Sequence, residues 1–323
     1  YTRESFADVR RLLSPSGAVV LFFWAETPWI AERLAGLLRD AFGAAPLSFW
    51  IPSSSLCLGH GGMMLFGGRE STLADIRRRT LADPQLAPLL RNRTTPAEAP
   101  VLTTDDWPYL YLQHPTIPKY HLLVGVASLV LGLGLRRRLF RPSERADSPM
   151  MLLGAGFMLL EVTGVSRAAL FYGTTWTVNG YVVGAILTMI LAANLVASRW
   201  RIDPTGWPFA GLAASLLILG WLPTSWVASL DVTPRIVVGG AFLAIPVFFS
   251  GLVFVAAWAG RERRDLALGS NIFGSLLGGV ASLLSMLLGF RVLTFLTLVV
   301  YLAALLGLRA ERRGTGEEGR IAV

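Results

Sequence analysis

The chain has 323 residues, of which 53% are hydrophobic and only 15% are charged, and its mean hydropathy is +0.55. A soluble domain carries about 25% charged residues, so this composition excludes an ordinary globular protein. The net charge of +8 does not indicate a nucleic-acid partner, because many arginines lie between apolar segments, where they set membrane orientation. The single cysteine, Cys57, excludes an intramolecular disulfide and a cysteine-based metal site, and the three histidines show no ligand spacing. We therefore expect no metal.

Charged residues are distributed unevenly along the chain. Residues 1–116 hold a normal mixture of charged and apolar positions, whereas from Ile117 onward charge is confined to short islands. This division predicts a soluble part, a membrane part over residues 117–308 and a polar tail over 309–323. The sequence opens with Tyr1 directly into a helical pattern, so we expect this chain to be a portion of a longer protein, with the upstream half of that protein as its partner.

The soluble part shows strand and helix patterns in alternation. The continuous apolar run Ala18–Trp24 is typical of a strand buried on both faces of a parallel sheet. Two further strands, Leu47–Ile51 and Gly62–Phe66, are joined by about ten residues and are expected to pair antiparallel. The first 23 residues resemble the later helix and fifth strand of class I S-adenosylmethionine-dependent transferases. The resemblance implies an α/β, partial Rossmann-like fold over residues 1–70, the C-terminal half of a methyltransferase-type domain. The expected helices are one capped by Thr2, one from Pro28 to Gly43 and a basic one over Thr72–Leu81.

A cofactor site is not visible in these residues. Class I transferases bind the cofactor with a glycine-rich first loop and an acidic residue after the second strand, and neither stands ahead of the predicted strands here. The glycine-rich stretches Gly59–Gly62 and Gly67–Gly68 flank the last strand instead. We interpret them as turns, with a ligand loop as the alternative.

The connector, residues 71–116, contains the run TTDDWPYLYL shortly before the first membrane segment. Asp105 and Asp106 in this run form a carboxylate pair beside Trp107 and Tyr109. Two carboxylates beside aromatic rings could orient a cationic substrate such as a polyamine. The alternative is a capped turn next to the membrane, with aromatic side chains at the interface.

Seven apolar segments approach the roughly 20 residues that a helix needs to cross a bilayer, so the lipid bilayer is an expected partner. The loops and tail on one side of these segments hold 14 arginines and those on the other side hold 2. The positive-inside rule places the arginine-rich side in the cytoplasm. With seven crossings the soluble part then faces outside, which conflicts with a cytoplasmic cofactor. The predicted all-α bundle spans 117–135, 149–172, 178–197, 207–229, 234–259, 266–289 and 291–308.

Polar residues inside these apolar segments mark a candidate site. A charge at the centre of a membrane helix costs roughly 2.5–3.5 kcal/mol on insertion scales, so Glu161 and Arg167 must face protein, pair or contact a ligand. We expect them to pair with each other, helped by an asparagine across the bundle, while Thr163 shares a face with Arg167. These residues either fix helix packing or line a path for a substrate or ion. The candidate asparagines are Asn179, Asn194 and Asn271.

Small residues recur every four positions in the sixth apolar segment, at Ser270, Gly274, Gly278 and Ser282. Such a stripe lets two helix backbones approach closely in a membrane. The stripe therefore predicts helix packing rather than chemistry.

The run Gly154–Asn179, together with TDDWPYLYL ahead of it, resembles bacterial membrane proteins described as fused major-facilitator/spermidine synthase proteins. The resemblance implies an integral, multi-pass protein of the bacterial cytoplasmic membrane. It also implies a membrane-anchored transferase that moves an aminopropyl group from decarboxylated S-adenosylmethionine, or a group from S-adenosylmethionine itself, to a polyamine. The catalytic aspartate and cofactor loop of that family fall before Tyr1, so no catalytic residue can be carried over. The alternatives are a transporter or translocation module with a degenerate, non-catalytic domain, and a structural anchor.

Overall fold

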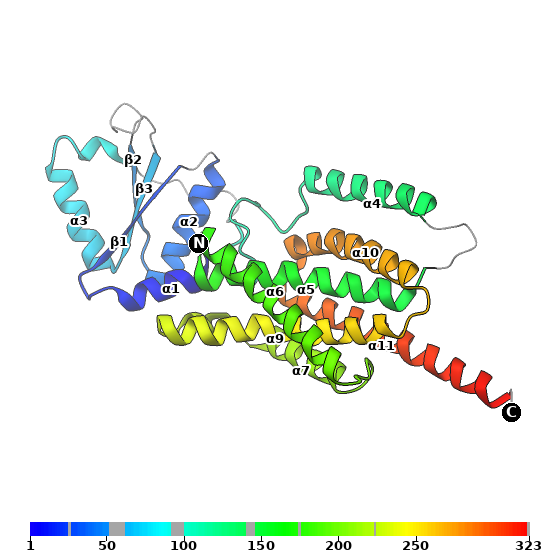
Figure 1. Cartoon of the computed structure of the whole chain (residues 1–323). Helices are drawn as coiled ribbons and strands as arrows, with labels where there is room; N and C mark the ends of the chain where they lie inside the picture. The colour runs from blue at the N-terminus through cyan, green and yellow to red at the C-terminus, as the bar shows by residue number, and fades with distance from the viewer. Residues whose placement is uncertain are drawn as a thin grey trace. The chain divides into compact units, whose positions relative to one another are not determined.

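The computed structural model describes residues 1–24, 27–51, 62–91, 100–139, 146–173, 176–222 and 224–321. The chain divides into two compact units, Tyr1–Thr116 and Ile117–Val323. The boundary falls where the charged residues of the sequence thin out. Figure 1 shows strands in the first unit and helices throughout the second. Each unit is described by itself.

The first unit begins with a helix whose ends follow local capping rules. Thr2 accepts a hydrogen bond from the Ser5 amide, and Ser5 returns one from its side chain to the Thr2 backbone, so a capping box starts the helix. The second helix ends at Gly43, whose φ of 74° needs a glycine. In chain order the elements are α1 (Arg3–Leu12), β1 (Ala18–Phe23), α2 (Pro28–Phe42), β2 (Leu47–Ile51), β3 (Gly62–Gly68), α3 (Glu70–Ala82), the 3-10 turn η2 (Ala87–Leu89) and β4 (Leu90–Arg91).

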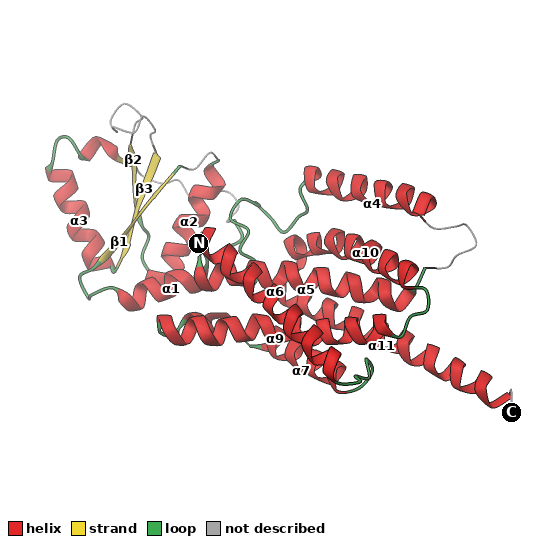
Figure 2. Ribbon diagram, viewed as in Figure 1, coloured by secondary structure: helices red, strands yellow, loops and turns green. Residues whose placement is uncertain are grey.

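The sheet of this unit is antiparallel, and the predicted partial Rossmann-like fold is wrong. The strand order is β1-β3-β2-β4, and each described pair runs antiparallel, including β2 with β3 as expected. Figure 2 shows the strands in yellow. β3 lies between β1 and β2, so these two strands never pair in parallel. β1 is not buried on both faces either, because Val20 is 50% exposed and Phe22 is 46% exposed. The apolar run Ala18–Trp24 predicts a strand covered on both faces, but one face of β1 is open.

Helix α2 supplies most of the core of this unit. Leu34, Leu37 and Leu38 are fully buried and form one cluster with Phe6 of α1 and Leu65 of β3. This apolar face of α2 recurs at positions three and four apart, which is the pattern that buries one side of a helix.

The second unit is helical throughout its described residues. Two helices of this unit have a proline in their first turn. In one of them the Asp147 side chain caps the helix by accepting a hydrogen bond from the Met150 amide, and Pro149 lies in the first turn. The helices are α4 (Lys119–Leu139), α5 (Ser148–Tyr172), α6 (Trp176–Arg199), α7 (Trp207–Trp221), α8 (Thr224–Ala228), α9 (Val232–Ala259), α10 (Arg264–Ala281), the 3-10 turn η3 (Ser282–Leu284) and α11 (Ser285–Ile321).

Four helical segments of the described chain are long and apolar enough to cross a membrane: Ser148–Tyr172, Val182–Arg199, Thr233–Ala259 and Arg264–Arg313. The sequence predicted seven. Lys119–Leu135 and Trp207–Trp221 are apolar but shorter. The predicted segment 207–229 divides because α7 ends at Trp221, two residues before Pro223; proline disfavours helical geometry in the residue before it and donates no backbone hydrogen bond.

The segment Arg264–Arg313 turns back on itself at Gly289, whose φ of 81° interrupts α11. Contacts along α5 show the reversal. Residues of α10 meet α5 in the same order along both helices, Gly274 at Met151 and Gly278 at Ala155. Residues of α11 meet α5 in the opposite order, because Tyr301 lies against Gly156 whereas Gly307 lies against Pro149. The 50-residue segment therefore runs along α5 twice, in opposite directions.

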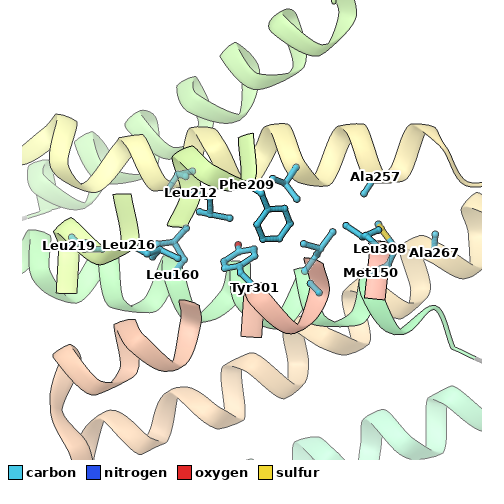
Figure 3. Packing of buried hydrophobic residues seen from close by; sticks show 14 residues of the cluster. Met150, Leu160, Phe209, Leu212, Leu216, Leu219, Ala257, Ala267, Tyr301 and Leu308 are labelled. Atoms are coloured by element: carbon cyan, nitrogen blue, oxygen red, sulfur yellow. The ribbon is translucent and has the colours of Figure 1, made fainter. Parts of the chain in front are cut away.

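The core of the second unit lies between α5, α7, α9 and α11. Figure 3 shows Tyr301 of α11 and Phe209 of α7 at its centre, with ring centroids 6.4 Å apart in an edge-to-face arrangement. Leu160, Leu212 and Leu216 pack beside them and are at most 2% exposed. These buried apolar residues form one cluster.

Candidate functional site

Arg167 is a buried cation within the helical unit. It projects from α5, is 4% exposed, and donates hydrogen bonds to the Leu219 carbonyl of α7 at 2.6 Å and to the Thr294 hydroxyl of α11 at 3.1 Å. Leu219 lies in the last turn of α7, where backbone carbonyls have no partner within the helix. Arg167 thus joins the end of α7 to α5 and α11, which is a structural use of the charge.

The predicted pair between Glu161 and Arg167 is wrong for the described residues. Glu161 is half-buried and forms no ion pair with Arg167 there. The two residues are six positions apart on one helix, so their side chains point about 120° away from each other. Arg167 takes its hydrogen-bond partners from α7 and α11 instead. Thr163 is 1% exposed and donates to the Leu159 carbonyl one turn back, which satisfies its hydroxyl within α5.

The two candidate asparagines whose side chains are described, Asn194 and Asn271, do not gather at Arg167. Asn271 of α10 donates to the Met150 carbonyl of α5 at 3.1 Å, near the opposite end of α5. Asn194 of α6 is exposed. The side chain of Asn179 lies outside the described residues. An asparagine therefore bridges two helices, as polar side chains commonly do in membrane bundles, but it does not contact the buried arginine.

Close packing of α5 on α10 accounts for most of the small-residue stripe. A Cβ added at Gly274 or Gly278 would collide with the carbonyl oxygens of Met151 or Ala155. The Ser270 hydroxyl accepts a hydrogen bond from the Asp147 amide at 2.9 Å. Ser282 departs from the prediction, because α10 ends at Ala281 and the Ser282 hydroxyl donates to Gly279 within the turn that follows.

Asp105 holds the start of α1 in place. Its carboxylate accepts a hydrogen bond from the Thr2 hydroxyl at 2.7 Å, and its amide donates to the Glu4 carboxylate at 3.0 Å. The rings of Trp107 and Tyr109 lie edge to face, with centroids 5.8 Å apart. Asp106, beside them, also makes an interaction within the chain. The contacts of Asp105 match the capped-turn interpretation of this run.

Arg33 is a buried cation that sequence reasoning missed. It projects from α2, is fully buried, and donates to four backbone carbonyls of the segment that follows β4. The guanidinium also stacks near two indole rings, 4.9 Å from the Trp29 centroid and 5.5 Å from that of Trp107. The acceptors are Val101 at 2.6 Å, Tyr109 at 3.3 Å, Leu110 at 2.7 Å and Gln113 at 2.8 Å.

These contacts make Arg33 the residue that shapes the TTDDWPYLYL segment. Desolvation lowers the pKa of the Arg33 guanidinium to about 10, so the group still carries its proton at neutral pH. The planar, charged guanidinium donates hydrogen bonds to four carbonyls at once. It thereby holds an irregular segment against α2 without strand pairing. The only sequence signal was an arginine on the apolar face of a helix, among Ile30, Leu34 and Leu37.

The described residues do not fit S-adenosylmethionine or its decarboxylated form. The glycines of β3 are in contact with side chains rather than with an open cradle: a Cβ at Gly62 would lie 2.7 Å from the Phe22 ring, and one at Gly67 would lie 2.7 Å from Leu38. Gly59, His60 and Gly61 lie outside the described residues. No group of three or more potential metal ligands occurs in the described ranges.

No family model, curated protein or solved structure matches this chain. The class of protein is therefore set by the fold and the site alone. The chain is mainly helical, and four segments of its described residues have the length and hydropathy of membrane-spanning helices. It carries a small antiparallel α/β unit in its first 116 residues.

Proposed function

We propose that this chain is a membrane anchor: the helical unit sits in the bacterial cytoplasmic membrane and holds the antiparallel unit at its surface. The observation that carries the proposal is the use of buried polar groups to join helices. Arg167 connects α5 to α7 and α11, and Asn271 connects α10 to α5. A transport path would instead expose such groups to a cavity. Two cavities, of about 420 and 700 Å³, are lined by other residues.

The proposal includes seven crossings with the arginine-rich side in the cytoplasm, which puts the antiparallel unit outside the cell. The alternation of helix directions along α5 supports this arrangement. α10 runs parallel to α5, and α11 and α9 run antiparallel to it, as the Asp147–Arg261 and Tyr172–Gly239 contacts at opposite ends show.

The only cysteine offers a direct test of membrane placement and orientation. Cys57 belongs to the first unit, so we expect a membrane-impermeant maleimide to label it in intact cells after outer-membrane permeabilisation. A matched variant, Cys57→Ser with Ser198→Cys, places the thiol at an exposed position at the end of α6. It should react only once the cytoplasmic membrane is opened. The reverse labelling order would overturn the orientation, and recovery of the chain in the soluble fraction would overturn the anchor.

A translocation module is a second candidate, favoured by Glu161. This half-buried carboxylate lies in an apolar helix, and the described residues give it no ion-pair partner. A carboxylate in such a place is expensive and is usually functional. Proteoliposomes that contain the wild type or Glu161→Gln decide between the candidates. The anchor predicts equal, background proton and polyamine flux in both. A wild-type flux that the substitution abolishes would favour translocation.

The anchored protein is, by resemblance, a spermidine synthase-like transferase. The local observation in favour is the placement of the half-buried Asp105 and Asp106 beside the Trp107–Tyr109 ring pair, since carboxylates next to aromatic rings suit a cationic amine. The cofactor would bind outside the described residues, so catalysis is not assigned to this chain. Calorimetry with spermidine provides the test: saturable binding that Asp106→Asn weakens supports the substrate class, and absence of binding removes it.

A further inference from the structure

A charged cavity of the helical unit lies at its arginine-rich end. It has a volume of about 700 Å³ and is bounded by the end of α6, the loop that follows it, the end of α9 and the last apolar turn of α11. Arg199, Arg201, Arg261 and Arg312 line it, with Glu311 as the acidic residue of the lining. A cavity with this balance attracts an anion.

Two of the four arginines are already neutralised within the chain. Arg261 lies 2.9 Å from the Asp147 carboxylate and 2.6 Å from that of Glu311. Arg312 lies 2.8 Å from Asp203. These ion pairs tie the start of α5, the α6–α7 loop and the end of α9 to α11. The charges of Arg261 and Arg312 are therefore held in ion pairs and are not available to a ligand.

Arg199 and Arg201 are the charges that remain available. Both are exposed, and within the described residues neither forms an ion pair or hydrogen bond through its side chain. They stand on either side of Trp200, which is 64% exposed. An exposed tryptophan at the end of an apolar helix is typical of the membrane–water interface, and basic pockets between helices at that level bind lipid headgroups.

Most of the remaining lining is apolar. Val255, Ala256 and Ala259 of α9 and Leu308 of α11 contribute to it. A free phosphate would find two arginines but would leave this surface uncovered. A phospholipid would place its phosphate at the arginines and its glycerol and first methylenes against the apolar residues. The chemistry of the lining therefore favours a lipid over a small soluble anion.

We propose that this cavity is a binding site for the headgroup of an anionic phospholipid, with Arg199 and Arg201 as its phosphate ligands. The inference rests on the membrane placement of the helical unit and goes beyond its role as an anchor. A bound lipid would join α6, α9 and α11 at the cytoplasmic surface. It would fix the end of α6 through two side chains that the protein itself leaves unused.

Native mass spectrometry of the full chain from nanodiscs tests this site. We expect phosphatidylglycerol to be retained over phosphatidylcholine, and the double variant Arg199→Gln/Arg201→Gln to weaken that retention roughly 30-fold, because each arginine near an anionic surface contributes about fivefold. The matched control, Arg309→Gln/Arg313→Gln, removes two exposed charges from the same end of the molecule but from outside the cavity. It should retain the lipid nearly as the wild type does.

Three outcomes would overturn the proposal. Arg309→Gln/Arg313→Gln could lose as much lipid as Arg199→Gln/Arg201→Gln, which would mean that the overall charge of this end, and not the cavity, attracts the lipid. Retention could be equal for both lipids. Inorganic phosphate at millimolar concentration could displace the lipid fully, which would assign the cavity to a soluble anion. Membrane association of every variant, measured by resistance to carbonate extraction, separates these outcomes from failure of the anchor itself.

Discussion

Among the described residues each unit buries one arginine, and the two arginines have different structural roles. Arg33 is fully buried in the first unit and binds four backbone carbonyls of one irregular segment. Arg167 is 4% exposed in the helical unit and binds one carbonyl and one hydroxyl. Arg33 organises a stretch that has no strand or helix of its own. Arg167 connects helices that are already packed by apolar and small residues.

The comparison teaches how each unit gains its shape. Backbone carbonyls in an irregular buried segment need donors from elsewhere, because no sheet or helix supplies them. In the first unit one guanidinium provides these donors. In the helical unit most backbone groups find a partner within their own helix, so stability depends on how closely the helices approach. Loss of Arg33 should therefore cost more than loss of Arg167.

The largest effect is expected for Arg33→Met. The substitution keeps the apolar stem but leaves four carbonyls without a charged donor, so we expect the first unit to lose about 3 kcal/mol or more of stability, since each buried unsatisfied group costs about 1–3 kcal/mol. Limited proteolysis of the solubilised chain would show this as cleavage in residues 100–116 at lower temperature. Arg33→Lys should recover part of the loss, because an ammonium lacks the planar fork.

Arg39→Met is the matched control for this prediction. Arg39 lies on the same helix, but it is exposed in the last turn of α2. Its removal should cost at most about 1 kcal/mol, through the helix dipole. If both variants resist proteolysis equally well, Arg33 does not organise the segment and the contrast between the two arginines fails.

Gly274→Ala tests the close approach of helices, which we expect to be the main source of stability in the helical unit. The added methyl would collide with the Met151 carbonyl, and because backbone cannot move aside cheaply we expect a loss of about 1–3 kcal/mol. Gly164→Ala on α5 is the control, since a Cβ there meets nothing within 4 Å and alanine favours helix by about 1 kcal/mol. Opposite shifts in the melting temperature of the solubilised chain would support helix contact as the main source of stability. Equal shifts would contradict it.

The elements of the molecule were largely predictable, whereas their arrangement was not. Caps and periodicity placed α1, α2 and β2 within a residue or two, because Thr2, Pro28 and Gly43 act locally. Sheet order depends on which strands meet, and the apolar run of β1 gave no information on that. The division of 207–229 was visible in Pro223, but the apolar residues around it suggested one continuous span.

The two buried arginines show likewise that contacts between residues distant in sequence were not predictable. Arg167 attracted attention because its neighbours in sequence are apolar for a full span. Arg33 lies in an amphipathic helix with Glu32 and Arg39 nearby, where an arginine is ordinary. Its burial depends on Val101–Gln113, which is remote in sequence. The partner of Arg167 was misassigned for a similar reason, because Thr294 becomes its neighbour only after α11 turns back at Gly289.

Arg167→Met should have a smaller effect than Arg33→Met. The Thr294 hydroxyl also donates to the Phe290 carbonyl, so it keeps a partner, whereas the Leu219 carbonyl loses the Arg167 donor. Polar contacts between membrane helices average about 0.6 kcal/mol and reach about 1.7, and we expect a loss within this range. A double-mutant cycle with Thr294→Val, measured by thermal unfolding in detergent, would isolate the contact. A loss as large as that of Arg33→Met would remove the distinction between the units.

The smallest effect concerns an exposed ion pair at the end of the bundle, between Asp203 and Arg312 at 2.8 Å. Desolvation opposes ionisation, but hydrogen bonds from Thr205 and Arg312 prevail and hold the pKa of Asp203 below its ordinary value of 3.8. A carboxyl with a lowered folded pKa adds stability above its unfolded pKa, and this stability is lost as the pH falls through the folded value. Asp203→Asn should therefore lower the melting temperature slightly at pH 6, and this difference should shrink as the pH falls below 3.8. Because both side chains are half exposed, the difference at pH 6 should stay below about 1 kcal/mol. A larger effect would mean that this end of the bundle is held by charge, and that the close approach of α5 and α10 is not its main support.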